Sequence, residues 1–236
     1  MLIHIFDRHG QLVKTDALPG SHVWANGTGI DGRGDVYFLN ASPMVVHGER
    51  YFNDHGGTLI KFTPGRARLL TAHNDNAPVP LNDKPDRPLD LYKPGVWVQG
   101  AQWLHPGVGW NCNYSTACSC WNCRFALDIY GRSFTPETDR YSVGVLDTAG
   151  NLILRFGRYG NVDDGLPLVR EGGPSEPRSI GGDETAFMHA PYLAVHTDNR
   201  VFAADPGNAR IVSVKLGYYT DRKVPLKKVS GRRRRR

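Results

Sequence analysis

Residues 124–157 contain short apolar segments joined by tight turns, and this pattern constrains the fold more than any other feature of the chain. Read with a period of two residues, the stretch RFALDIYGRSFTPETDRYSVGVLDTAGNLILRFG predicts four short β-strands. Two of the turns, at 128–131 and 147–150, begin with Asp and end with Gly, which favours a tight reversal of the chain. The stretch is therefore predicted to form one four-stranded antiparallel sheet.

The same unit recurs along the chain. Its first half, in which a strand is followed by Asp, two residues, Gly and a second strand, is found again at 28–39 and at 192–204. In the latter copy His196 replaces Asp and Asn199 replaces Gly, and Asn is the residue other than glycine that best tolerates a left-handed turn position. The second half recurs at 3–13, and 59–70 is a degenerate copy. Repeats of this size predict an all-β protein built from blade-like sheets.

The stretch 191–214 resembles the repeat of NHL-repeat β-propellers, in which the order is strand, turn, strand, Asp-x-x-Asn-x-Arg and strand. Asp205, Asn208, Arg210 and Ile211 fall on the most recognisable positions of that repeat. The resemblance extends over about half of the residues. It implies a β-propeller fold. It implies less about function, because the family includes lyases, relatives of hydrolases and pure binding modules.

The repeats also predict how the chain is organised. We expect a half blade at 2–14, whole blades at 27–70, 124–157 and 190–229, an insertion rich in Cys, Trp and Pro at 71–123, and a basic, disordered tail at 230–236. This gives roughly three and a half blades, whereas a closed propeller has about 4–8. An open arc leaves unpaired strand edges, which favour association. The alternatives are that the chain is part of a longer propeller whose N-terminal part is missing, or that another copy completes the arc.

The predicted connections are short turns at one end of the blades and long loops at the other end. The residues that we take as candidates for ligand binding fall in these long loops: Trp24, His55, Trp97, Trp103, His105, Trp110, Trp121 and His189. Long loops on a rigid scaffold are a usual location of function. The tryptophans have two interpretations: they form the small core that a long insertion needs, or they form a platform for a sugar-like or otherwise flat ligand.

Four cysteines lie within twelve residues, at Cys112, Cys118, Cys120 and Cys123. Four thiolates could close a tetrahedral structural site for zinc or iron. However, the spacing matches neither a zinc ribbon nor a ferredoxin, and Arg124 stands where c-type haem attachment needs His. Two disulfides are the main alternative, and a redox-active pair or free thiols are further ones. In each case we expect the cluster to order the long insertion.

The net charge of +6 arises in the C-terminal segment. Residues 222–236 hold nine basic residues and no acidic ones, so the rest of the chain has 20 basic and 23 acidic residues and a net charge of −3. Binding of nucleic acid or another polyanion would therefore depend on the arginine tail alone, and we do not favour it. No apolar run is long enough to cross a membrane and no signal peptide is visible, so we expect a soluble protein. Its location stays open, and export is expected only of a longer form of the protein.

These observations favour a binding function. The hypothesis is a propeller segment that recognises a protein, a small molecule or a carbohydrate through its long-loop face. The first alternative is a metal-dependent enzyme that resembles the propeller lyases and lactonases, with a metal held by histidines such as His22, His55, His105 or His189. The second alternative is polyanion binding through the tail. No catalytic residue is identified by the sequence.

Overall fold

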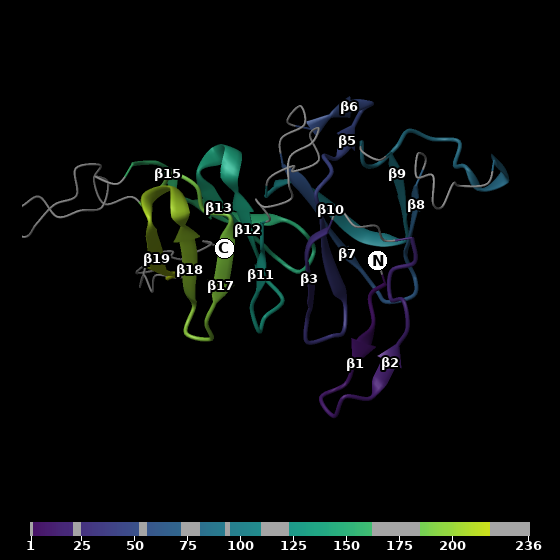
Figure 1. Ribbon diagram of the computed structural model, residues 1–236, viewed down its shortest axis with the longest axis horizontal. Coiled ribbons are helices and arrows are strands. Elements are labelled where there is room, and N and C mark those ends of the chain that lie inside the picture. The colour runs from purple at the N-terminus through teal and green to yellow at the C-terminus, as the bar shows by residue number, and fades with distance from the viewer. Residues whose placement is uncertain are drawn as a thin grey trace, which may run out of the picture.

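The fold is taken from a computed structural model that describes residues 2–20, 25–51, 56–71, 81–92, 95–109, 123–161 and 185–217. In these residues the regular structure consists of β-strands and short 3-10 turns, which confirms the all-β prediction. The described part of the chain contains no helix that is long and apolar enough to span a membrane. Figure 1 shows the strands gathered into several small sheets.

Three sheets form the body of the molecule, and we call them sheets I, II and III in chain order. Sheet I contains β3 (Ala25–Ile30), β4 (Val36–Asn40), β7 (Gly57–Phe62) and β10 (Ala101–Val108), in the order β10-β7-β4-β3. Sheet II contains β11 (Ala126–Leu127), β12 (Ser133–Glu137), β13 (Ser142–Leu146) and β14 (Leu152–Phe156), in chain order. Sheet III contains β17 (Tyr192–Val195), β18 (Arg200–Asp205) and β19 (Arg210–Lys215), also in chain order. All neighbouring strands within the three sheets are antiparallel.

Smaller elements surround these sheets. Three antiparallel pairs are β1 (Ile5–Phe6) with β2 (Leu12–Lys14), β5 (Val45–Val46) with β6 (Glu49–Arg50), and β8 (Arg68–Thr71) with β9 (Val96–Gln99). One parallel pair joins β15 (Arg158–Tyr159) to β16 (Ala186–Phe187). The 3-10 turns are η2 (Leu81–Asp83), η4 (Thr138–Arg140) and η5 (Pro206–Asn208).

The predicted blade at 27–70 is wrong in its fourth strand. The segment predicted at 67–70 does form a strand, β8, but it pairs with β9 in a separate two-stranded sheet. The fourth strand of sheet I is β10, which pairs with β7 and comes from within the predicted insertion at 71–123. The β8–β9 hairpin therefore interrupts the connection between β7 and β10. The last predicted blade extends to residue 229, and its residues 218–229 lie outside the described residues.

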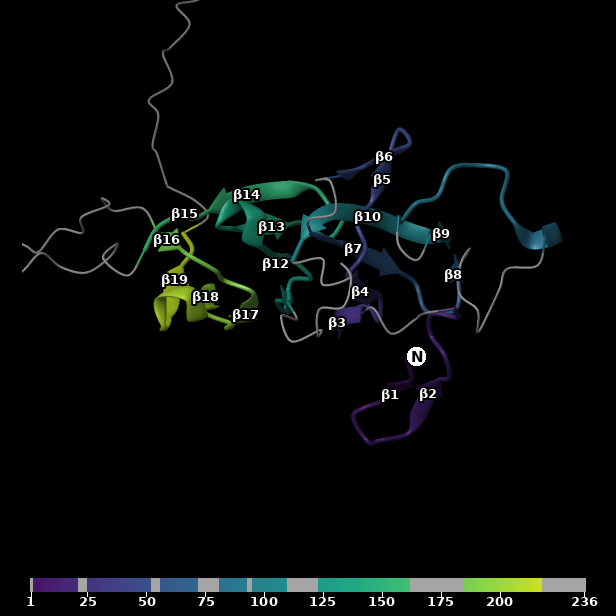
Figure 2. The ribbon, with the colours of Figure 1, turned by 45° about the horizontal axis from the view of Figure 1, so that its top comes forward.

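The sheets pack face to face (Figure 2). A hydrophobic core fills each junction. The junction of sheets I and II contains Tyr37, Leu39, Leu59, Val108, Cys123 and Leu146. The junction of sheets II and III contains Phe134, Val143, Val145, Leu193, Val201 and Ala203, with Phe187 and Ala190. On its other face sheet I is covered by the β8–β9 hairpin and Leu18, and Ile3 and Ile5 from the N-terminal hairpin pack at the border of this core. The three cores therefore alternate with the three sheets, in the order of the chain.

The predicted Asp–Gly turns are built by one recurring set of hydrogen bonds. In the turn after β11, one carboxylate oxygen of Asp128 accepts hydrogen bonds from the backbone N–H groups of Tyr130 and Arg132, each at 2.9 Å. Asp7, Asp31 and Asp147 make the same pair of bonds in their own turns. The fourth residue is a left-handed glycine in all four turns, with φ between +77° and +85°. Asn199 has φ of +66° at the equivalent position, which confirms the predicted replacement.

Sheets II and III have closely similar local structure. In both, the second and third strands are joined by a 3-10 turn that ends on a left-handed residue, Tyr141 (φ 54°) in sheet II and Ala209 (φ 50°) in sheet III. The registers correspond as well: sheet II pairs Ala126 with Phe134, Phe134 with Val145 and Pro136 with Val143, whereas sheet III pairs Ala194 with Phe202, Phe202 with Ser213 and Ala204 with Ile211. The two sheets are copies of one structural repeat.

The two ends of the sheets differ in the way that the sequence predicts, with one exception. The turns β3–β4, β11–β12 and β17–β18 lie together at the lower end in Figure 1, which we call the short-turn end. The β5–β6 hairpin and the turn between β12 and β13 lie at the opposite end, the loop end. The exception is the long connection from β7 to β10. Because Phe62 pairs with both Val36 and Ala101, this connection leaves and rejoins sheet I at its short-turn end.

Candidate functional site

The candidate site lies at the loop end, where the ends of β10 and β12 meet between sheets I and II. The backbone N–H of Gly109 donates to the carbonyl of Pro136 at 2.6 Å, and the hydroxyl of Thr138 donates to the carbonyl of Gly109 at 3.2 Å. Gly109 has φ of +71°, and a Cβ there would lie 2.8 Å from the Cβ of Cys123. This close approach requires glycine. It fixes the point from which the chain leaves β10 toward β11.

A buried carboxylate stands beside this junction. Glu137, the last residue of β12, accepts hydrogen bonds from the hydroxyl of Ser142 at 2.9 Å and from Nη2 of Arg155 at 2.9 Å, and Nε of Arg155 also contacts it. Its side chain is 4% exposed, whereas that of Arg155 is 33% exposed. The hydrogen bond that Arg155 donates to Glu137 raises the pKa of Arg155, although partial burial opposes this. The pair therefore fixes a guanidinium at the loop end with one side open to solvent.

His105 on β10 lies within electrostatic range of this charged pair. The pKa of His105 lies below its ordinary value, mainly because the half-buried ring loses hydration when it is charged. The Glu137 carboxylate acts to raise this pKa, and Arg155 and Arg140 act to lower it. The imidazole is therefore neutral at neutral pH. A neutral imidazole can accept a hydrogen bond, take up a proton or bind a metal ion.

A related polar arrangement occurs at the same end of sheet III, on the Asp-x-x-Asn-x-Arg motif. The buried carboxylate of Asp205 accepts hydrogen bonds from the backbone N–H groups of Met188 and His189 and from the amide of Asn208 at 2.7 Å. Asn208 also donates to the carbonyl of Gly160, and Nη2 of Arg210 donates to the carbonyl of Ala186. The motif therefore ties the β14–β17 connection to sheet III.

The described candidate residues do not form one cluster. Trp97 is 4% exposed in the β8–β9 hairpin, where its indole N–H donates to the carbonyl of Arg87 at 2.9 Å. Trp103 is half-buried on β10, and its N–H donates to the carbonyl of Thr148 at 3.0 Å, in a turn of the short-turn end. The prediction that these two tryptophans lie in loops at the loop end is therefore wrong. Both lie on strands with satisfied N–H groups, as core residues do.

His189 is half-buried beside Asp205, at the junction of sheets II and III. The pKa of His189 is lowered, mainly by burial, although the Asp205 carboxylate acts to raise it. His105 was predicted in a loop, but it lies on strand β10 at the junction of sheets I and II, so this part of the prediction is wrong as well. The remaining candidates, Trp24, Trp110, Trp121, His22 and His55, lie outside the described residues.

The cysteine cluster is described only at its last member. Cys123 is buried in the core between sheets I and II, next to Gly109. Cys112, Cys118 and Cys120 lie outside the described residues, on the connection from β10 to β11. In 2–20, 25–51, 56–71, 81–92, 95–109, 123–161 and 185–217, no three His, Cys, Asp or Glu side chains are grouped so that they could hold a metal ion. The choice between a metal site and disulfides stays a prediction.

Sequence reasoning missed two buried charged groups. One is the Glu137–Arg155 pair, for which the signal is the equivalence of Glu137 with Asp205 at the end of the second strand.

The other group is Lys61, which is 2% exposed and lies 3.2 Å from Asp31 and 3.4 Å from Asp35 at the short-turn end. Its ammonium also donates to the carbonyl of Thr148 at 3.2 Å, which joins sheet I to sheet II. Burial opposes the charge of Lys61, but the neighbouring Tyr37 and Asp31 outweigh burial and raise its pKa. No pattern in the sequence marks Lys61.

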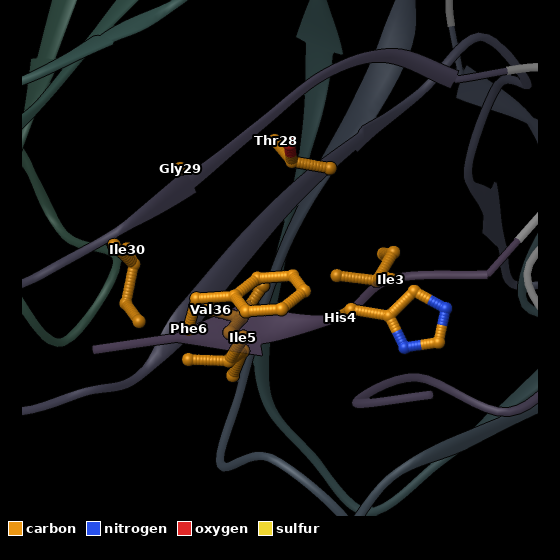
Figure 3. A pocket seen from close by; sticks show the side chains of 8 residues that line it. All are labelled: Ile3, His4, Ile5, Phe6, Thr28, Gly29, Ile30 and Val36. Carbon is orange, nitrogen blue, oxygen red and sulfur yellow. The ribbon is translucent and has the colours of Figure 1, made fainter. Parts of the chain in front are cut away.

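A shallow groove lies on the other side of sheet I, between β1 and the edge strand β3. Its volume is about 270 Å³, and Figure 3 shows the eight residues that line it: Ile3, His4, Ile5, Phe6, Thr28, Gly29, Ile30 and Val36. The lining is mainly apolar, and His4 is its one titratable side chain. The groove is thus distinct in position and chemistry from the polar residues at the loop end.

Comparison of the chain with models of known protein families and with curated proteins found no match. The resemblance to NHL-repeat propellers therefore depends on the repeat itself, as it is seen in the residues and in the equivalent turns and registers of sheets II and III.

Proposed function

We propose that this chain is an NHL-like β-propeller segment that binds a protein partner, a small molecule or a carbohydrate through its loop end. The proposal is carried by one observation: Arg155 is bonded to the buried Glu137 where sheets I and II meet, and both residues, together with Arg140, act electrostatically on the neutral His105. Cations held beside a neutral imidazole suit a ligand that offers carboxylate or hydroxyl oxygens. The Glu137 pair holds one of these cations in place, which reduces the entropy lost on binding.

The connections support this assignment. The long segments between β4 and β7, β10 and β11, and β14 and β17 all begin at the loop end, whereas the short-turn end carries the repeated four-residue turns. Long loops on a rigid scaffold are where binding residues usually concentrate. We infer that the predicted cysteine cluster between β10 and β11 orders one of these segments, either through zinc or iron or through disulfides.

The test compares two charge reversals at opposite ends of the molecule. Arg140 is exposed in the turn η4 at the loop end, and Arg33 is exposed in the β3–β4 turn at the short-turn end. Immobilised wild type, Arg140→Glu and Arg33→Glu are each exposed to a cell extract, a glycan array and a panel of carboxylates. We expect a ligand that is bound by wild type and Arg33→Glu and is lost on Arg140→Glu. The proposal would be contradicted if Arg140→Glu bound every ligand that the wild type binds, or if ligands were lost only on Arg33→Glu.

The alternative function is that of a metal-dependent lyase or hydrolase. The observation in its favour is that His105 and His189 are both half-buried and both have lowered pKa values, as neutral metal ligands require. Metal analysis together with a thiol count separates this from a structural cysteine site. Metal retained after Cys112, Cys118, Cys120 and Cys123 are changed to Ser would support the enzyme. Metal lost with the cysteines would support the structural site, and four thiols that appear only under reductant would support disulfides.

Polyanion binding through the arginine tail is the least favoured function, because the rest of the chain carries a net charge of −3. Binding of heparin across a salt titration, with and without residues 230–236, tests it. We expect weak binding that falls steeply with salt and disappears with the tail.

A further inference from the structure

The outer face of sheet III repeats, position by position, a face that is buried in sheets I and II. In sheet II, Phe134 and Val143 point toward sheet III and are 2% and 0% exposed. The registers place Phe202 and Ile211 at the equivalent positions of sheet III. There these two side chains are 36% and 73% exposed.

Sheet I buries the side chains at these same positions against the next sheet. Counted from its Asp–Gly turn, Tyr37 occupies the position of Phe134, and Leu59 occupies the position of Val143. Both are completely buried against sheet II. The exposed side chains of sheet III therefore continue an interface that the molecule already forms twice. Tyr192 (39% exposed) and Ala194 on β17 extend this apolar face, which we call the open face.

At the other end of the row of sheets, the β1–β2 hairpin exposes the other half of the same interface. The β1–β2 hairpin pairs Phe6 with Leu12 and Ile5 with Lys14, as β13–β14 pairs Leu146 with Leu152 and Val145 with Leu154. Each hairpin has a register shift at the same position, between Ile5 and Phe6 and between Val145 and Leu146. The β1–β2 hairpin is thus the structural counterpart of β13–β14.

This equivalence identifies the outward side of the hairpin. Ile5 packs toward sheet I, as its counterpart Val145 packs toward sheet III. Phe6 lines the groove beside β3 but is 58% exposed, whereas its counterpart Leu146 is completely buried against sheet I. Leu12 and Val13 on β2 are also exposed, at 53% and 64%. A side chain that is buried in the internal interface is therefore exposed here.

We propose that the open face of sheet III packs on the outward side of the β1–β2 hairpin of a second copy of this chain. One chain carries both halves of a sheet-to-sheet interface, one on sheet III and one on the β1–β2 hairpin, so a second copy offers a complementary surface to each. Such a head-to-tail contact joins two different surfaces, and it closes into a ring if the rotation between copies allows it and otherwise forms an open polymer. This proposal does not depend on the ligand of the loop end.

The experiment uses full-length protein in sedimentation velocity over a dilution series. Ile211→Arg places a charge in the open face, Phe6→Arg places one on the hairpin, and Ile129→Arg is the matched control in the β11–β12 turn, where Ile129 is 65% exposed. Because all three side chains are largely exposed, each variant should keep the wild-type circular dichroism and unfolding midpoint. We expect the wild type and Ile129→Arg to associate alike, and each end variant to associate at least about tenfold more weakly.

Mixing the two end variants gives the sharpest result. The Ile211→Arg protein keeps an intact hairpin and the Phe6→Arg protein keeps an intact open face, so the mixture should associate more strongly than either variant alone. A wild type that stays monomeric at every concentration would overturn the proposal and assign the open face to another partner. Association that is unchanged in both end variants, or a mixture that behaves like the separate variants, would overturn it equally.

Discussion

The protonation of His105 links the loop end to the stability of the fold. Because its pKa is lowered in the folded chain, the unfolded chain takes up the proton first as the pH falls. Stability from this residue is therefore complete above about pH 6.5 and is lost as the pH falls through the lower pKa of the folded state. We expect His105→Gln to reduce the loss of stability between pH 7.5 and pH 5.5, as measured by urea unfolding. Part of the loss of stability should remain in this variant, because the pKa of His189 is also lowered.

A second measurement assigns the effect to the neighbours of His105. The Glu137 carboxylate acts to raise the pKa of His105, so Glu137→Gln should lower this pKa further. An NMR titration of the imidazole measures it directly. A His105 pKa at or above that of a histidine in an unfolded chain would show that neither burial nor the two arginines dominate the protonation of the ring.

The Glu137–Arg155 pair is the next residue-scale feature with a measurable effect. Glu137→Gln preserves the size of the side chain but removes the charge that faces Arg155 and Ser142. Because Arg155 is partly exposed and water can solvate it, we expect a loss of about 1–2 kcal/mol in the free energy of unfolding. Glu49→Gln, at an exposed position on β6, is the control and should change stability by less than about 0.5 kcal/mol. Equal effects of the two changes would contradict a structural pair.

At the scale of elements, the Asp–Gly turns are equivalent in backbone and different in surroundings. Gly10 and Gly150 have φ of +79° and +85°, but a Cβ at Gly10 meets nothing within 4 Å, whereas one at Gly150 would lie 2.8 Å from the ring of Trp103. Both alanine variants should lose about 1–2 kcal/mol through the left-handed backbone. Gly150→Ala should lose a further 1–3 kcal/mol, roughly, because the ring that bonds to Thr148 must move.

Urea unfolding of the two glycine variants checks this difference. The Trp103 fluorescence should shift in Gly150→Ala and stay unchanged in Gly10→Ala. Similar losses in both variants would mean that the β13–β14 turn does not pack on β10 and that sheets I and II do not meet at the short-turn end.

The elements that the sequence predicts well are those with local signals. Asp128 and Gly131 determine their turn through contacts within five residues, and the same chemistry identified the turn at Asn199. The fourth strand of sheet I was missed because its pairing is not local: Ala101 returns to Phe62 after the whole β8–β9 excursion. No turn chemistry links two strands that are so far apart in sequence.

Trp97, Trp103 and His105 lie on strands, although the sequence places them in loops. His105 lies beside the loop-end cluster, but Trp97 and Trp103 occupy core positions because each indole N–H finds a backbone carbonyl. A tryptophan in a long sequence insertion gives no sign of whether its strand joins a sheet. Glu137 and Lys61 were missed for a related reason, since a charged residue in a strand is ordinarily expected on the solvent side.

At the scale of the whole molecule, face-to-face stacking explains both the loop end and the open face. Because each sheet repeats the previous one, equivalent connections emerge at the same end, and the last sheet presents the side chains that earlier sheets bury. The hydrophobic cores define this stacking: each of the two inter-sheet cores contains methyl groups from both neighbouring sheets, and a third covers the outer face of sheet I. The proposals for ligand binding and for association both depend on it.

Nuclear Overhauser effects between methyl groups, measured on Ile, Leu and Val methyl-labelled protein, test the stacking most directly. The structure predicts contacts that link Leu39 and Leu59 of sheet I to Leu146 of sheet II, and Val143 and Val145 of sheet II to Leu193 and Val201 of sheet III. It predicts no contacts between the methyl groups of these two clusters and those of Leu69, Val96 and Val98 on the far side of sheet I. Cross-peaks confined to single sheets, or joining Leu69 to Val201, would contradict the stacked arrangement.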